Sequence, residues 1–68
     1  ANEDAVNNTG NSYAALQDYE NAIVYFRKAI ELNPANAKAL NNLGVTLMLT
    51  GKKEEGEQFI AKAKSAGS

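Results

Sequence analysis

The sequence predicts an all-α fold of four helices that pair into two antiparallel hairpins. Apolar residues recur at the three- and four-residue spacing of a helix face, and the breaks between these stretches are only a few residues long. Short breaks make consecutive helices antiparallel neighbours. The second half of the chain also repeats the pattern of the first. From a chain of 68 residues we expect one small domain that spans residues 1–68.

The first predicted helix runs from Glu3 to Leu16. Acidic residues at its start are favourable at a helix N-terminus, and its apolar stripe contains Val6, Tyr13 and Leu16. Gly10 lies in the same stripe, although glycine costs ~1 kcal/mol relative to alanine inside a helix. We therefore expect Gly10 to allow the close approach of a neighbouring helix.

The second predicted helix runs from Tyr19 to Leu32, with Asp18 as its N-cap. Its apolar face consists of Ala22, Phe26, Ala29 and Leu32, flanked by Ile23 and Ile30. Such alternation of small and large residues is typical of a helix that packs against another helix. The helix ends before Pro34, because the residue before a proline avoids the α region and proline has no amide hydrogen. Tyr19 and Tyr25 are predicted to be packing or surface residues.

The third predicted helix runs from Ala37 to Leu49, with Asn36 as its N-cap and Gly51 as the left-handed residue just past its end. It is apolar on nearly every side, through residues Leu40, Leu43, Val45, Leu47, Met48 and Leu49. The fourth predicted helix runs from Lys53 to Ala66 and carries Phe59, Ile60 and Ala63.

A shift of 34 residues superposes the two halves of the sequence without a gap. The shift lays Gly10 on Gly44, and it also lays Asn7 and Asn8 on Asn41 and Asn42, and Lys28 and Ala29 on Lys62 and Ala63. The repeated unit is a helical hairpin, so we divide the chain into repeat one, residues 3–36, and repeat two, residues 37–68. Stacked hairpins of this length form an α-solenoid.

The repeated unit resembles the tetratricopeptide repeat (TPR) family. The family signature has a large apolar residue, Leu, Gly and Tyr in the first helix, Ala, Phe and Ala in the second, and Pro at the end. Repeat one matches through Gly10, Tyr13, Ala22, Phe26, Ala29 and Pro34, while Val6 is conservative and Thr9 departs. Repeat two matches through Leu43, Gly44 and Ala63, while Leu40, Leu47 and Ile60 are conservative and Gly56 and Ser68 depart. The resemblance implies a right-handed solenoid in which Gly10 and Gly44 let the two helices of each hairpin close.

The resemblance also implies a non-catalytic protein–protein interaction module. Family members typically bind an extended peptide, or a partner helix, in a concave groove lined by the first helix of each repeat. The implied groove residues are Asp4, Asn7, Asn8, Asn11 and Ala14 in repeat one, and Lys38, Asn41, Asn42, Val45, Met48 and Leu49 in repeat two. An asparagine amide both donates and accepts hydrogen bonds, so it can pair with a peptide backbone without selecting side chains. The same asparagines can also be ordinary solvated helix residues.

Two other interpretations of this surface stay open. Some family members clamp a C-terminal carboxylate; Asn11 and Asn42 match that clamp, but Asn7 stands where it needs a lysine, which disfavours it. Val45 and its apolar neighbours can instead bury against a second copy of the chain, because so small a core favours self-association. The alternative function is therefore a structural or homo-oligomerisation module, or a packing fragment of a larger TPR protein, with a homodimer as its simplest form.

The outer face of the fourth predicted helix differs from that of the second. Where repeat one has Ile23 and Ile30, repeat two has Glu57 and Lys64. Terminal repeats of a solenoid need a polar outer face. We therefore expect the array to end with repeat two and further repeats to precede Ala1 in a parent protein.

Composition argues against several classes of function. A net charge of −1 gives no general attraction to nucleic acid, and no apolar run approaches the ~20 residues that span a bilayer. Without histidine or cysteine, the usual nucleophile–base pairs and thiolate metal sites cannot form. Gly51, Lys52 and Lys53 do not match a phosphate-binding loop. The preceding glycine is at the wrong spacing, and Lys53 stands where the motif has Ser or Thr. We expect no enzyme, cofactor or metal, and a protein or peptide as the partner.

Overall fold

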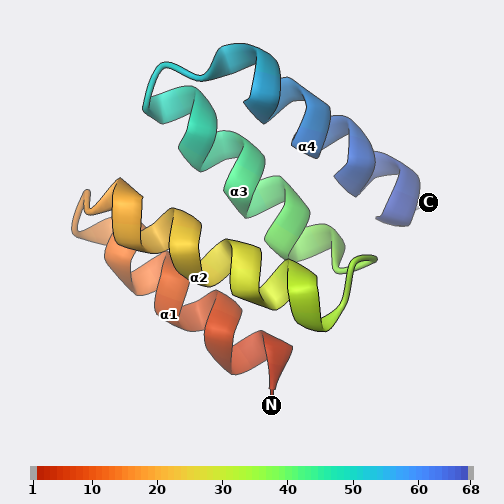
Figure 1. Cartoon of the computed structure of the whole chain (residues 1–68), viewed down its shortest axis with the longest axis horizontal. Coiled ribbons are helices and arrows are strands. Elements are labelled where there is room, and N and C mark those ends of the chain that lie inside the picture. The colour runs from red at the N-terminus through yellow and green to blue at the C-terminus, as the bar shows by residue number, and fades with distance from the viewer. Residues whose placement is uncertain (1, 68) are drawn as a thin grey trace.

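The computed structural model describes residues 2–67 and contains four helices in the predicted order (Figure 1). They are α1, Glu3–Ala15; α2, Tyr19–Leu32; α3, Ala37–Leu49; and α4, Lys53–Gly67. Their ends lie within one residue of the predicted ones, and the all-α prediction of two antiparallel hairpins is confirmed. Ser68, the predicted end of repeat two, lies outside the described residues.

Side-chain caps fix where three of the helices begin. The Oδ1 atom of Asp18 accepts a hydrogen bond from the Asn21 amide at 3.4 Å, and that of Asn36 accepts from the Ala39 amide at 3.1 Å. Both caps were predicted. Asn2 caps α1 in the same way, through the Asp4 amide at 2.9 Å. Each cap satisfies an amide that has no partner within its helix.

Glycines allow the closest contacts within each hairpin. A Cβ atom added at Gly10 would lie 2.6 Å from Cε1 of Phe26, so only glycine leaves room for that ring. In the second hairpin, a Cβ at Gly44 would lie 2.6 Å from the carbonyl oxygen of Gly56, and one at Gly56 would lie 2.5 Å from that of Gly44. The prediction of a close helix approach at Gly10 and Gly44 is confirmed. Gly56, which departs from the family signature, is the matching half of the second contact.

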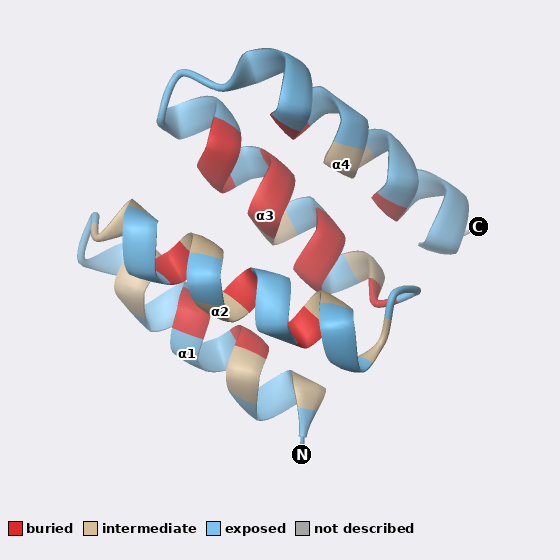
Figure 2. Ribbon diagram, viewed as in Figure 1, coloured by how far each residue is buried: buried red, intermediate tan, exposed pale blue. Residues whose placement is uncertain are grey.

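The hydrophobic core lies between α2 and α3, with Ala22, Phe26, Leu43 and Leu47 at its centre. Helix α3 runs between α2 and α4 (Figure 1) and carries much more buried surface than α1 (Figure 2). This asymmetry accounts for Thr9, which departs from the signature. Thr9 is exposed, whereas Leu43, at the equivalent place in repeat two, packs fully buried in the core.

Two leucines predicted to belong to the apolar stripes are largely exposed. Leu16 is 76% exposed and Leu32 is 45% exposed. Leu16 lies just past the end of α1, and Leu32 is the last residue of α2, where the chain turns away towards the next helix. Each apolar face therefore ends before its last leucine reaches a neighbouring helix.

A hydrogen-bonded link joins the start of α1 to the loop between α2 and α3. The Oε1 atom of Glu3 accepts from Nδ2 of Asn33 at 2.9 Å and from Nδ2 of Asn36 at 2.7 Å. Asn36 is buried and is also the N-cap of α3. Glu3 thereby helps to fix the start of the second hairpin against the first.

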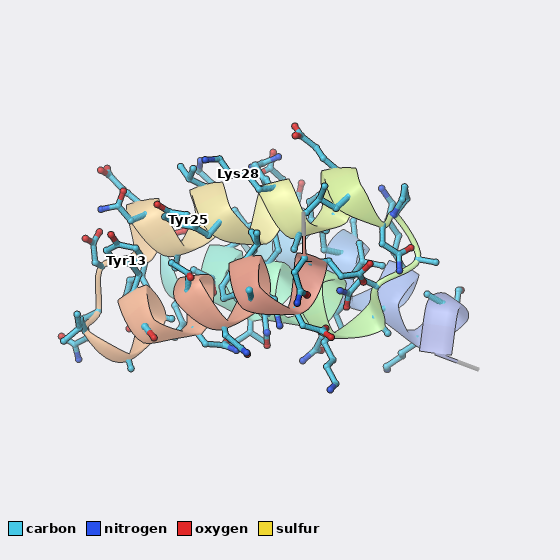
Figure 3. The ribbon with its side chains drawn as sticks, turned by 90° about the horizontal axis from the view of Figure 1, so that it is seen from below. Tyr13, Tyr25 and Lys28 are labelled. Atoms are coloured by element: carbon cyan, nitrogen blue, oxygen red, sulfur yellow. The ribbon has the colours of Figure 1, made fainter. Side chains whose placement is uncertain are left out.

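An aromatic and lysine pair recurs in the second helix of each repeat. Tyr25 stacks on Tyr13 of α1 with ring centroids 5.4 Å apart, and Nζ of Lys28 lies 5.0 Å from the Tyr25 centroid (Figure 3). In α4, Nζ of Lys62 lies 5.0 Å from the ring centroid of Phe59. The 34-residue shift relates both members of the two pairs. A lysine three residues beyond an aromatic residue lies over the same helix face, where a cation–π contact contributes ~0.5–1 kcal/mol.

Candidate binding groove between α1 and α3

Helices α1 and α3, the first helices of the two repeats, run in the same direction (Figure 1). A hollow of about 370 Å³ lies between them. It is lined by Asn11, Ala14, Tyr19, Phe26, Asn41, Asn42, Val45, Thr46 and Leu49. We call these nine residues the α1–α3 groove. The walls come from both repeats, so the stacking of the hairpins creates the groove.

Six of the eleven predicted groove residues line this groove: Asn11, Ala14, Asn41, Asn42, Val45 and Leu49. They come from α1 and α3, the helices that the family resemblance implies. The large apolar side chains Val45 and Leu49 are 43% and 60% exposed.

Asn7 lies inside the contact between the two helices. It is only 4% exposed, and its Oδ1 atom accepts a hydrogen bond from Nδ2 of Asn42 at 3.2 Å. The pair spans 35 residues of sequence and joins repeat one to repeat two. A buried amide oxygen without such a partner would destabilise the fold by ~1–3 kcal/mol. The structure therefore gives Asn7 a stacking role and keeps it off the groove surface.

Four further predicted groove residues lie outside the groove lining. Asp4 and Asn8 are exposed on α1 and do not line the groove. Lys38 lines a separate shallow depression with Ala37, Asn41, Ala63 and Lys64. Met48 packs towards α4, where its Cγ atom would lie 2.5 Å from a Cβ placed on Gly56.

Tyr19, Phe26 and Thr46 line the groove but were not among the predicted site residues. Tyr19 begins α2 directly after the short turn from α1, so that turn brings it to the end of the groove near the last turn of α1. The short break between the first two helices is the feature of the sequence that could have predicted this position of Tyr19. Thr46 is buried and its Oγ1 atom donates to the carbonyl oxygen of Asn42 at 2.7 Å.

The groove offers unused hydrogen-bonding groups and carries no formal charge. The side chains of Asn11 and Asn41 make no hydrogen bond or ion pair with any residue in the 2–67 range. Each amide can therefore supply two N–H donors and one acceptor oxygen to a ligand. None of the nine lining residues is an Asp, Glu, Lys or Arg. The groove thus combines unpaired amides with exposed apolar side chains and has no charged residue in its lining.

A larger hollow, of about 570 Å³, is lined by Gly51, Lys52, Lys53, Glu54 and Glu55. These are consecutive residues of the α3–α4 turn and the first turn of α4, and their charges are of both signs. Within residues 2–67, no group of three or more acidic side chains is placed to hold a metal ion. None of the helices described is both long enough and apolar enough to cross a membrane.

The stacked hairpins and the groove between their first helices define an α-helical repeat protein. The chain belongs to the tetratricopeptide repeat family. A family model described as TPR repeat matches residues 10–51, and one described as tetratricopeptide repeat matches residues 37–66. TPR repeats mediate protein interactions and are typically non-catalytic, so this chain is a protein-interaction module of the helical-repeat type.

Three curated proteins illustrate the likeness. The chain is 44% identical over 46 residues to DnaJ homolog subfamily C member 7 of Homo sapiens, which covers 68% of this chain and 9% of the relative. It is 38% identical over 58 residues to photosystem I assembly protein Ycf3 of Rippkaea orientalis, covering 82% of the chain and 34% of the relative. It is 45% identical over 40 residues to serine/threonine-protein phosphatase 5 of Homo sapiens, covering 59% of the chain and 8% of the relative. The chain thus spans at most about a third of these relatives.

Proposed function

We propose that this chain binds a peptide segment or a partner helix of another protein in the α1–α3 groove. The observation that carries the proposal is the convergence of Asn11 from α1 with Asn41, Val45 and Leu49 from α3 on one hollow. These residues come from both repeats and combine free amides with exposed apolar side chains. Such a mixture of a few polar groups with apolar surface is typical of ligand sites.

In this proposal the asparagine amides and the apolar side chains of the groove contribute to binding in different ways. The amides of Asn11 and Asn41 pair with polar groups of the ligand, which fixes its position. Val45 and Leu49 bury apolar surface of the ligand, which contributes about 25 cal/mol per Å² removed from water. The hydrogen bond to Asn7 uses one of the two side-chain N–H groups of Asn42. The other N–H group and the amide oxygen can pair with the ligand.

The proposal can be tested by selecting peptide ligands from a displayed library of random heptapeptides. The chain is immobilised, and the selected peptides are retested against Asn41→Ala and Leu49→Ala variants. Both side chains are exposed, so truncating them should leave the helical circular dichroism signal unchanged. We expect each variant to weaken binding by about tenfold, equivalent to ~1.4 kcal/mol.

Asn8→Ala is the matched control, because Asn8 is an exposed asparagine of α1 that lies outside the groove lining. Its binding should equal that of the unmodified chain. Peptides that bind both groove variants as well as the unmodified chain would contradict the proposal. Asn42→Ala is a poor test, since it also removes the hydrogen bond to buried Asn7.

The exposure of Val45 and Leu49 favours homodimerisation as the second candidate function. Sedimentation equilibrium over a wide concentration range separates the two. A monomer at every concentration supports a groove that receives another protein. A dimer that dissociates in the Leu49→Ala variant supports self-assembly through the groove.

A further inference from the structure

We propose that the α1–α3 groove takes an extended, uncharged peptide segment with one large apolar side chain, and that this side chain sits at the end formed by Tyr19, Val45 and Leu49. This inference rests on the proposed function and specifies its ligand. It specifies that the ligand is an extended segment, not a helix, and that the segment is neutral, neither acidic nor basic.

The groove changes character along its length. On α3, Asn41 and Asn42 come first, Val45 follows one turn later, and Leu49 follows one turn after that. Because α1 and α3 run in the same direction, the last turn of α1 and the start of α2 lie at the Leu49 end, which adds Ala14 and Tyr19 to the apolar side. Asn11 of α1 is the counterpart of Val45 under the 34-residue shift, so its amide lies midway along the groove. The amides therefore occupy the Asn41 end and the middle of the groove, and the Leu49 end is apolar.

The length of the groove sets the length of the segment. Asn41 and Leu49 are eight residues apart on one helix, which corresponds to about 12 Å along its axis. An extended chain covers about 3.3 Å per residue, so about four ligand residues span this distance. Val45 and Leu49 are four residues, or about 6 Å, apart, so about two ligand residues cover them. Side chains alternate along an extended chain, so one of the two faces this part of the groove.

The unpaired amides of the groove favour an extended segment over a helix. A helix satisfies its own backbone hydrogen bonds, so it would leave the amides of Asn11 and Asn41 without use. An extended backbone presents free N–H and C=O groups to them.

The charge of the lining favours a neutral ligand. All nine lining residues are uncharged, so a carboxylate or ammonium group in the groove would lose water without gaining a counter-charge. The nearest charged positions on the same helices, Asp4 and Lys38, lie in their first turns and have opposite signs. Lys38 lies about 10 Å along the helix axis from Val45, given seven residues of separation. Neither charge lies at the apolar end, where the Asp18 carboxylate next to Tyr19 already accepts hydrogen bonds from the backbone amide and from Nδ2 of Asn21.

The heptapeptide selection tests this inference when it is counter-selected on an Asn41→Ala/Leu49→Ala double variant, which removes peptides that bind elsewhere. We expect the remaining peptides to share one large apolar residue and to lack Asp, Glu, Lys and Arg in the adjacent residues. Groove-dependent peptides rich in acidic or basic residues would overturn the inference while leaving the proposed function intact. Failure to recover any groove-dependent peptide would overturn the inference together with the peptide-binding form of the proposed function, and would leave only the partner helix.

A recovered peptide, synthesised with acetylated and amidated ends, completes the test by calorimetry. Replacing its apolar residue with alanine should weaken binding to the unmodified chain by about tenfold or more. The same replacement should have little further effect on binding to Leu49→Ala, because that side chain is its contact. Asn11→Ala should weaken binding while Asn8→Ala should not. A peptide that gains helical circular dichroism on binding would overturn the extended conformation.

Discussion

At the scale of single residues, the turn after α1 carries a cost that the turn after α3 avoids. Gln17 has a φ angle of 62°, and Gly51, at the equivalent place in repeat two, has a φ of 88°. A side chain in this left-handed region costs ~1–2 kcal/mol, whereas glycine has no Cβ to clash. Gln17 is exposed, so removing its side chain would remove few packing contacts.

We therefore predict that Gln17→Gly stabilises the domain by ~1 kcal/mol. Urea unfolding followed by circular dichroism measures the change. Gln17→Ala is the control, because alanine keeps the Cβ atom and should bring no comparable gain. The converse substitution, Gly51→Ala, should destabilise by a similar amount. A Gln17→Gly midpoint at or below that of the unmodified chain would contradict this account.

The contact of α3 with α4 makes a prediction at the scale of helical elements. The family signature has alanine where repeat two has Gly56, so restoring alanine looks harmless from sequence alone. The added Cβ would lie 2.5 Å from both the Gly44 carbonyl oxygen and Cγ of Met48. Because the carbonyl belongs to the backbone, the two helices must separate. Overpacking of this kind costs ~1–3 kcal/mol.

We expect Gly56→Ala to lower the free energy of unfolding by that amount, measured by urea unfolding. Gly67→Ala is the matched control in the same helix, because a Cβ there meets only the Cβ of Ala37 at an ordinary 3.5 Å. Equal stability of the two variants would show that the helices can adjust freely at Gly56.

The hydrogen-bonded link from Glu3 makes a second prediction at this scale. Glu3→Ala leaves Nδ2 of buried Asn36 without its acceptor, which should destabilise the domain by ~1–3 kcal/mol. Glu3→Gln retains an acceptor oxygen and should cost less. Thermal unfolding of the three proteins gives the order, and a Gln variant as unstable as the Ala variant would show that the negative charge, rather than the acceptor atom, matters.

Individual helices could be predicted from the sequence, but contacts between helices could not. Periodicity and capping residues such as Asp18 and Asn36 located all four helices, because those signals lie within a few residues of each other. The burial of Asn7 depends on Asn42, 35 residues away, and on how far α3 is rotated against α1. Helical periodicity shows on which face of its own helix a residue lies. It carries no information about how one helix is rotated against another. For the same reason Met48 was predicted in the groove, while its side chain packs towards α4.

At the scale of the whole molecule, stability depends on the interface between the two repeats. Phe26 is 1% exposed and belongs to a cluster with Leu43 and Leu47 of α3. We predict that Phe26→Ala costs ~3–5 kcal/mol, which is comparable with the total stability of a small domain. Because repeats stabilise only their neighbours, the helices of both should be lost together. A cooperative thermal transition close to that of the unmodified chain would contradict the core assignment.

The outer face of α4 determines whether another hairpin can stack on the molecule. In repeat one, Ile23 and Ile30 pack against the core beneath the second hairpin, while their counterparts Glu57 and Lys64 are exposed on α4. The double variant Glu57→Ile/Lys64→Ile would give α4 the apolar surface that α2 uses for stacking. A new apolar patch that fits a different surface of the same molecule favours open head-to-tail association.

We predict that the average mass of Glu57→Ile/Lys64→Ile in sedimentation equilibrium rises with concentration more steeply than that of the unmodified chain. Gln58→Ile/Ser65→Ile is the matched control, since it adds the same side chains at the same spacing on α4. The repeat-one counterparts of these two positions, Val24 and Glu31, are exposed, so the control creates no stacking surface. Equal association of the two variants would mean that added apolar area alone drives assembly. Association of the Glu57→Ile/Lys64→Ile variant alone would mean that the two charges on α4 prevent stacking at this face.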